Sequence, residues 1–386
     1  MKILLTSMKK TIFLISLFFF FFAFLSPVFS ISANEQIIDS IGDELSSFKE
    51  SLPDYVLEFL PDEIFSGNFS LLLDEGLDEK KLLSYVIDYF FAGLGSVVKS
   101  FSTVLVLILI SSIFEMLSSS FNNSSVKLAF STCSTLSIGL TVFNICISLC
   151  KLTSTYINGL CQAMSAFAPI MTTIQIMNGS ITGATLSNSI MLLFISVTEG
   201  IFAVFMLPLV KICMMLCCAK SLGGIEFGGI SRMVRNTFTS VTIFVMSIFM
   251  FIFSFKNVLA QGADSLSIKT ARFAISSFVP MVGASINDAL RTVSSSLSFI
   301  KSTCGVIAIL IIALIMLPII IHIFLNKLSF GFLASISKTI GCNSEGAMLE
   351  EADSLCTYML MLICCTCTLF IFAITIFIKT TIEVGV

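Results

Sequence analysis

Charged residues are scarce in this 386-residue chain: they make up 12% of the sequence, whereas hydrophobic residues make up 56%. A soluble globular domain carries about twice that charged fraction. Mean hydropathy is +1.03, and uncharged stretches of about 20 residues, the length that crosses a bilayer, recur along the chain. The composition therefore excludes an ordinary soluble protein and predicts an all-α fold, a polytopic helical membrane protein.

Histidine is almost absent, with one residue in the whole chain, His322. The sequence also lacks a P-loop, an HExxH motif, the Ser/His pairing of intramembrane serine proteases and a pair of intramembrane aspartates. Basic runs interleaved with aromatic residues, which are typical of nucleic-acid binding, are missing as well. We therefore expect no enzyme activity, no catalytic residue, no metal, no cofactor and no nucleic-acid partner.

Thirteen cysteines are present, but most lie within apolar stretches and none lies in residues 34–96. A disulfide framework would place them in a segment outside the cytoplasm instead. Cys217-Cys218 and the group Cys364 to Cys367 are the closest candidates for metal ligands, without a paired CxxC motif. The preferred interpretation is that the cysteines are small apolar packing residues.

The apolar stretches predict six membrane spans, at residues 100–117, 128–149, 186–209, 237–255, 302–325 and 356–378. Two shorter pieces, 163–177 and 273–284, are interrupted by prolines and predict re-entrant or interfacial segments. As one helix, residues 186–219 would measure about 50 Å, against about 30 Å of hydrocarbon. This helix is predicted to kink or end near Pro208.

Residues 1–33 have the features of a secretory signal peptide. A Lys-Lys pair precedes the apolar run Ile12–Leu25, and small residues follow at Ser30 and Ala33, in the order of a basic region, an apolar region and a cleavage site. An uncleaved signal anchor is the alternative. In either case the following residues are expected on the extracytoplasmic side of the membrane.

Residues 34–96 form an acidic segment with 14 acidic and 3 basic residues, a net charge of 3 − 14 = −11. Leu52-Pro53-Asp54 and Leu60-Pro61-Asp62 each predict a helix start, because proline fits the first helical turn and a carboxylate there complements the helix dipole. A third, amphipathic helix is predicted from Glu79 to about Lys99. We expect a small helical extracytoplasmic head, followed by a multi-span membrane domain over residues 97–386.

Two short patterns recur about 110 residues apart in the membrane domain. Ser165-Ala166-Phe167-Ala168-Pro169 resembles Ser276-Ser277-Phe278-Val279-Pro280, and Met206-Leu207-Pro208 recurs as Met316-Leu317-Pro318. The common offset indicates an internal duplication whose members carry matched prolines.

The duplication would make residues 127–236 and 237–347 two copies of one unit. If the two short pieces do not cross the membrane, each copy has two spans and the copies are parallel. If they do cross, each copy has three spans and the copies are inverted, as in many transporters. The basic residues of the loops are equally divided between the two sides, so the positive-inside rule leaves both arrangements open.

Glu199 is the one carboxylate well inside a predicted span. An intramembrane ionisable residue is a functional hypothesis by default, so Glu199 is the candidate pore or coupling residue. A structural polar contact is the alternative interpretation.

A glycine-rich segment follows the third predicted span and is the candidate hinge or contact loop. It lacks the Lys-Ser/Thr ending of a P-loop. Its residues are Gly223, Gly224, Gly228 and Gly229, with Arg232 and Arg235 just beyond.

The overall layout resembles the stage III sporulation protein AE family of endospore-forming Firmicutes. The similarity rests on the signal peptide, the two Leu-Pro-Asp segments, the matched segments ending in Pro169 and Pro280, the glycine-rich loop and the tail from Gly341 to Gly346. It covers nearly the whole chain and implies no catalytic residues.

Membership of that family implies a non-enzymatic component of the channel or secretion-like complex that joins mother cell and forespore. The expected location is the mother-cell membrane around the forespore, as a multi-pass protein in contact with membrane lipid. The expected partners are the other membrane proteins of the same operon and a cytoplasmic ATPase. The alternative hypothesis is a stand-alone secondary transporter of a small solute, with Glu199 as its coupling group.

Overall fold

The computed structural model describes residues 42–58, 60, 79–119, 124–177, 180–201, 207–223, 228–278 and 283–379. Within these ranges every regular element is a helix and no strand occurs. The all-α prediction is therefore confirmed. The signal peptide predicted over residues 1–33 lies outside the described residues, as do Pro61 and Asp62 of the second Leu-Pro-Asp segment.

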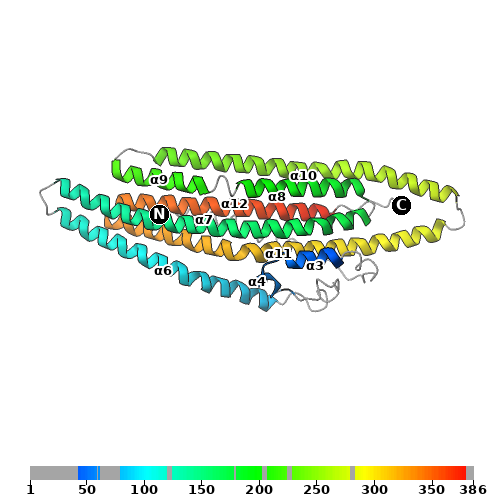
Figure 1. The fold of residues 1–386 in the computed structure, drawn as a ribbon, viewed down its shortest axis with the longest axis horizontal. Helices are drawn as coiled ribbons and strands as arrows, with labels where there is room; N and C mark the ends of the chain where they lie inside the picture. The colour runs from blue at the N-terminus through cyan, green and yellow to red at the C-terminus, as the bar shows by residue number, and fades with distance from the viewer. Residues whose placement is uncertain are drawn as a thin grey trace.

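The helices run up and down along one long axis (Figure 1). The helix α6 ends, and α7 begins, at the same end of the bundle at which α10 begins and α11 turns into α12. In chain order the elements are α3 (Gly42–Glu50), α4 (Asp54–Leu57), α6 (Glu79–Ser119), α7 (Ser124–Met177), α8 (Ile181–Gly200), α9 (Leu207–Gly223), α10 (Gly228–Phe278), α11 (Gly283–Ile340) and α12 (Asn343–Lys379).

Six of these helices are long and apolar enough to cross a membrane: α6, α7, α8, α10, α11 and α12. Each contains or overlaps one of the six predicted spans, which confirms a multi-pass membrane protein. In their most apolar stretches α11 and α12 bury 78% and 67% of their residues, whereas α6 and α10 bury 28% and 22%. The hairpin of α11 and α12 is therefore the core of the bundle, and α6 and α10 are outer helices.

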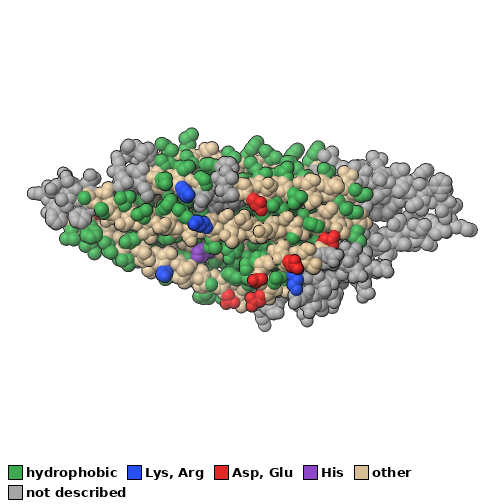
Figure 2. Space-filling model, in the orientation of Figure 1, with side chains coloured by type: hydrophobic (Ala, Val, Ile, Leu, Met, Phe, Trp, Pro, Cys, Tyr) green, Lys and Arg blue, Asp and Glu red, His purple; other side chains and the backbone are tan. Residues whose placement is uncertain are grey.

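The outer helices present apolar side chains to the surroundings, including Phe114 on α6 and Phe244 and Phe251 on α10. Figure 2 shows few charged side chains on the visible face, scattered among hydrophobic ones. An exposed apolar surface of this kind is stable where it contacts lipid and costly in water.

The prediction that residues 163–177 form a re-entrant or interfacial segment is wrong. They are the last part of α7, a continuous helix of 54 residues that contains Pro169. The piece that begins at residue 273 likewise continues α10 up to Phe278, and Pro280 lies outside the described residues. Both helices exceed the roughly 20 residues that a hydrocarbon core requires.

Near Pro208 the described helices are α8, which runs to Gly200, and α9, which begins at Leu207 with Pro208 in its first turn. Residues 202–206 lie outside the described residues, so the kink or end expected near Pro208 stays a prediction. A proline there loses no intrahelical hydrogen bond, because the first N–H groups of a helix have no partner in the helix.

The predicted duplication corresponds to two helical hairpins, α7 with α8–α9 and α10 with α11, which run in the same direction (Figure 1). This is the parallel arrangement with two long helices in each copy. The copies differ at their second proline, because Pro208 begins a new helix whereas Pro318 lies inside the unbroken α11. The duplication itself stays a prediction.

The N-terminal elements α3 and α4 pack on the bundle. The helix α4 begins at Asp54 directly after Pro53, as predicted. Leu45, Phe48, Leu52 and Val56 are buried in the same apolar core as the long helices. The helix predicted from Glu79 to Lys99 has no break before the first span, because both belong to the 41-residue helix α6.

A two-residue turn joins the core helices α11 and α12. The N–H of Cys342 donates to the carbonyl of Ser337 at 3.0 Å, and the N–H of Gly341 donates to the carbonyl of Lys338 at 3.3 Å. These are the two hydrogen bonds of a Schellman motif, which places its C′ residue in the left-handed region. Gly341 has a φ of 104°, which only glycine adopts without strain.

We predict that Gly341→Ala lowers the free energy of unfolding by about 1 kcal/mol, since a Cβ is strained at positive φ. The midpoint of thermal unfolding of the purified protein in detergent should fall by a few degrees. Gly95→Ala is the matched control, because Gly95 lies within α6 and a Cβ there meets nothing within 4 Å. The control should be neutral or stabilising; an equal fall for both variants would contradict the prediction.

Candidate functional site

A network of charged and polar side chains lies inside the bundle around the first eleven residues of α12. Its acidic members are Glu345, Glu351 and Asp353. Their partners come from four other helices: Ser111 of α6, Thr135 of α7, Ser231 and Arg235 of α10, and Lys327 of α11. We refer to these eight residues as the polar network.

Glu345 lies at the contact of α12 with α6 and α7. Ser111 Oγ and Thr135 Oγ1 donate hydrogen bonds to Glu345 Oε1 at 3.0 and 3.1 Å, and Glu345 is only 5% exposed. The first turn of a helix favours a carboxylate through the helix dipole. Ser111 and Thr135 belong to candidate spans, so this carboxylate joins α12 to two membrane helices inside the bundle.

Glu351 and Asp353 form ion pairs with the neighbouring core and outer helices. Arg235 of α10 forms an ion pair with Glu351, to which Ser231 Oγ also donates at 2.6 Å. Lys327 Nζ lies 2.8 Å from Asp353 Oδ1, and the Lys327 side chain is 4% exposed. Charges in a low-dielectric interior are tolerated only when they are paired and hydrogen-bonded, and here each has a partner on another helix.

Cys342, in the turn before α12, extends this region to Glu115 of α6. Its Sγ donates to Glu115 Oε2 at 3.7 Å. Burial, together with the nearby Glu345 and Glu115 carboxylates, raises the pKa of the Cys342 thiol to about 11. The thiol is therefore protonated at neutral pH and available as a hydrogen-bond donor.

The antiparallel hairpin explains why these charges meet. The two helices are antiparallel neighbours, so lysines of α11 that precede the turn come beside carboxylates of α12 that follow it. Lys327 pairs with Asp353, and Lys338 pairs with Glu350 closer to the turn. The opposite charges flanking Gly341-Cys342 are the sequence signal for this site. A last span predicted to begin at residue 356 leaves out the carboxylates of α12 that form it.

Glu199, the candidate pore or coupling residue, is not part of the polar network. It lies in the last turn of α8 with its side chain exposed, on the side of α7 that carries Cys161. No hydrogen bond or ion pair of Glu199 is found among the described residues. Its role stays a prediction.

Three of the four glycines of the candidate hinge or contact loop lie in helices rather than in a loop. Gly223 ends α9, and Gly228 and Gly229 already belong to α10, while Gly224 lies outside the described residues. Arg232 lies in α10, with a side chain that is not described. Arg235 is the one predicted residue of this group that the structure brings into the polar network.

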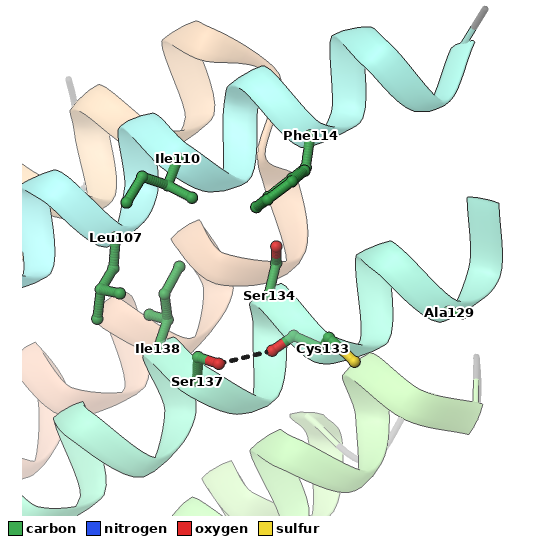
Figure 3. Close-up of a pocket in the computed structure, with 8 residues that line it drawn as sticks. All are labelled: Leu107, Ile110, Phe114, Ala129, Cys133, Ser134, Ser137 and Ile138. Carbon is green, nitrogen blue, oxygen red and sulfur yellow. Dashed lines mark hydrogen bonds between the residues drawn. The ribbon is translucent and has the colours of Figure 1, made fainter. Parts of the chain in front are cut away.

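An open groove of about 320 Å³ lies on the outer surface between α6 and α7 (Figure 3). Leu107, Ile110 and Phe114 of α6 face Cys133, Ser134 and Ser137 of α7 across it. Ser137 Oγ donates to the carbonyl of Cys133 at 2.9 Å, so this hydroxyl is satisfied within its own helix. In the described part of the chain, no cluster of three or more His, Cys, Asp or Glu side chains is arranged to hold a metal ion.

Residues 67–381, which include every helix from α6 to α12 and thus the whole polar network, match the family model described as stage III sporulation protein AE. The chain belongs to this family. It is also 22% identical over 277 residues to the stage III sporulation protein AE of Bacillus subtilis (strain 168). That alignment covers 69% of this chain and 63% of the relative. No solved structure matches the chain.

The family resemblance read from the sequence is thus confirmed.

We predict that Glu351→Ala lowers the free energy of unfolding by about 3 kcal/mol, because it leaves the Arg235 guanidinium in the bundle without its carboxylate. Thermal unfolding in detergent would measure the loss. Glu350→Ala is the neighbouring control: the Glu350–Lys338 pair is half exposed, at 50% and 42%, and should contribute less than about 1 kcal/mol. Similar losses for the two variants would contradict a special role for the network.

Proposed function

We propose that this protein is a non-enzymatic membrane component of the channel or secretion-like complex that joins mother cell and forespore during sporulation. Membership of the stage III sporulation protein AE family supports a sporulation role. The six candidate spans support an integral membrane location, which we place in the mother-cell membrane around the forespore.

The polar network is the observation that most favours a structural component of a complex. Its charged and hydroxyl groups pair with one another across five helices, so they bind the bundle together. A transport site would instead present such groups to a water-filled cavity. The protein therefore lines or supports the channel of the complex, and it acts through its partners.

The proposed partners are the other membrane proteins of the same operon and a cytoplasmic ATPase, which would supply the energy that a chain without a nucleotide-binding motif lacks. If the head lies between the two membranes, α6 crosses to the cytoplasm. The turn at Gly341-Cys342 then faces the ATPase side, and the end of α12 returns to the side of the head.

A stand-alone secondary transporter is the second candidate function. The observation that favours it is the position of Glu199, a carboxylate in the last turn of a candidate membrane-spanning helix, because ionisable residues in such helices often mark transport sites. The exposure of Glu199 on the outer surface is less favourable to this candidate, because a coupling group is expected to face the bundle interior.

The first test is deletion of the gene in its own spore-forming host, followed by measurement of forespore volume and late forespore transcription after engulfment. We expect the forespore to collapse and late transcription to be lost. A deletion strain that sporulates normally would refute the proposed function.

Complementation of that strain separates the two candidates. We predict that Glu199→Gln restores forespore volume to the wild-type level, because the channel role does not use this carboxylate. The transporter role predicts loss of function with normal membrane levels of the protein. Immunoblotting of the membrane fraction is the control for expression.

A further inference from the structure

Two long helices of the bundle contain proline in their interior, Pro169 in α7 and Pro318 in α11. Proline has no N–H, so the carbonyl four residues earlier loses its helical hydrogen bond. For Pro318 that carbonyl belongs to Leu314, which is 3% exposed in the core of the bundle. A buried carbonyl without a donor is costly.

Tyr85 of α6 supplies the missing donor. Its hydroxyl donates to the Leu314 carbonyl at 3.1 Å, across 229 residues of sequence. The bond joins the start of α6 to the proline position of the most buried helix. Tyr85 is thus a positioning residue for α11.

Tyr85 belongs to a cluster that contains four of the five tyrosines of the chain. The rings of Tyr85 and Tyr89 are 4.6 Å apart, and Tyr55 of α4 lies 6.3 Å from both Tyr89 and Tyr156 of α7. Tyr55 belongs to α4 in the N-terminal head, so the head contacts the tyrosine cluster that contains Tyr85.

The second interior proline lies under the other head helix, α3. Phe48 packs against Phe167 at 5.5 Å between ring centroids, and Thr173 Oγ1 donates to Glu44 Oε1 at 3.2 Å. These two contacts lie before and after Pro169 along α7. The helix α3 therefore contacts α7 on both sides of the proline position.

We propose that the head, α3 and α4, controls the bending of α7 and α11 at Pro169 and Pro318, with Tyr85 as the link to α11. Proline positions are where long helices bend, and docked head helices hold both. A partner that displaces the head would leave both proline positions free to bend. This inference goes beyond the proposed channel role and does not depend on it.

The test is hydrogen–deuterium exchange of the full-length protein in nanodiscs, followed by peptide mass spectrometry. Tyr85→Phe removes only the hydroxyl, so amides around residues 310–322 should exchange about tenfold faster, as expected for loss of one hydrogen bond to a buried group. Tyr156→Phe, a hydroxyl removed from the same cluster, should leave this region unchanged. Unchanged exchange in Tyr85→Phe would overturn the proposal.

Two further variants test the proline and the head. Pro318→Ala restores the N–H, so Tyr85→Phe should have no effect on exchange in that background. Tyr55→Ala should speed exchange near Pro318, and Phe48→Ala should do so near Pro169, while α10 residues 236–250 stay unchanged as the reference. If the head variants leave the proline regions unchanged, or if α10 loosens equally, the head does not control the bends.

Discussion

A charged group or a freed carbonyl inside this bundle is stabilised by a partner within the protein, because the surrounding hydrocarbon offers no hydrogen bonds. The buried Glu345 accepts hydrogen bonds from two hydroxyls, one on α6 and one on α7. Glu351 accepts hydrogen bonds from a guanidinium and a hydroxyl of α10. The same constraint applies to the backbone, where the Leu314 carbonyl takes the Tyr85 hydroxyl. Each of these bonds joins helices that are distant in sequence, so satisfying the polar groups also determines how the helices pack.

The hairpin of α11 and α12 is where this requirement is concentrated. It is the most buried part of the membrane domain. The helix α12, which follows the turn at Gly341, carries three interior carboxylates. The outer helices α6 and α10 have the complementary property, with apolar faces outward and a few polar residues inward. This division explains how one chain presents an apolar surface to lipid while it keeps ion pairs inside.

The structure agrees with the sequence where a local rule decides it. Runs of apolar residues predict the spans, and Pro53 marks the start of α4 because proline lacks an N–H that the beginning of a helix does not need. A local rule fails at Pro169, because this proline lies inside the continuous helix α7 and does not interrupt it. Interior prolines are tolerated in membrane helices when a neighbouring helix satisfies the freed backbone group; Tyr85 does so at Pro318, but no local pattern announces such a donor.

The functional candidates show the same limit. Glu199 stood out because it is a lone carboxylate in an apolar run, yet its side chain is exposed, whereas Glu345, Glu351 and Asp353 lie inside the bundle. By itself, the sequence determined the helical class, the six spans and the family, because these depend on composition, periodicity and layout. Only the tertiary structure decided which charges are buried together and where the head docks, because these depend on contacts between residues up to 234 positions apart.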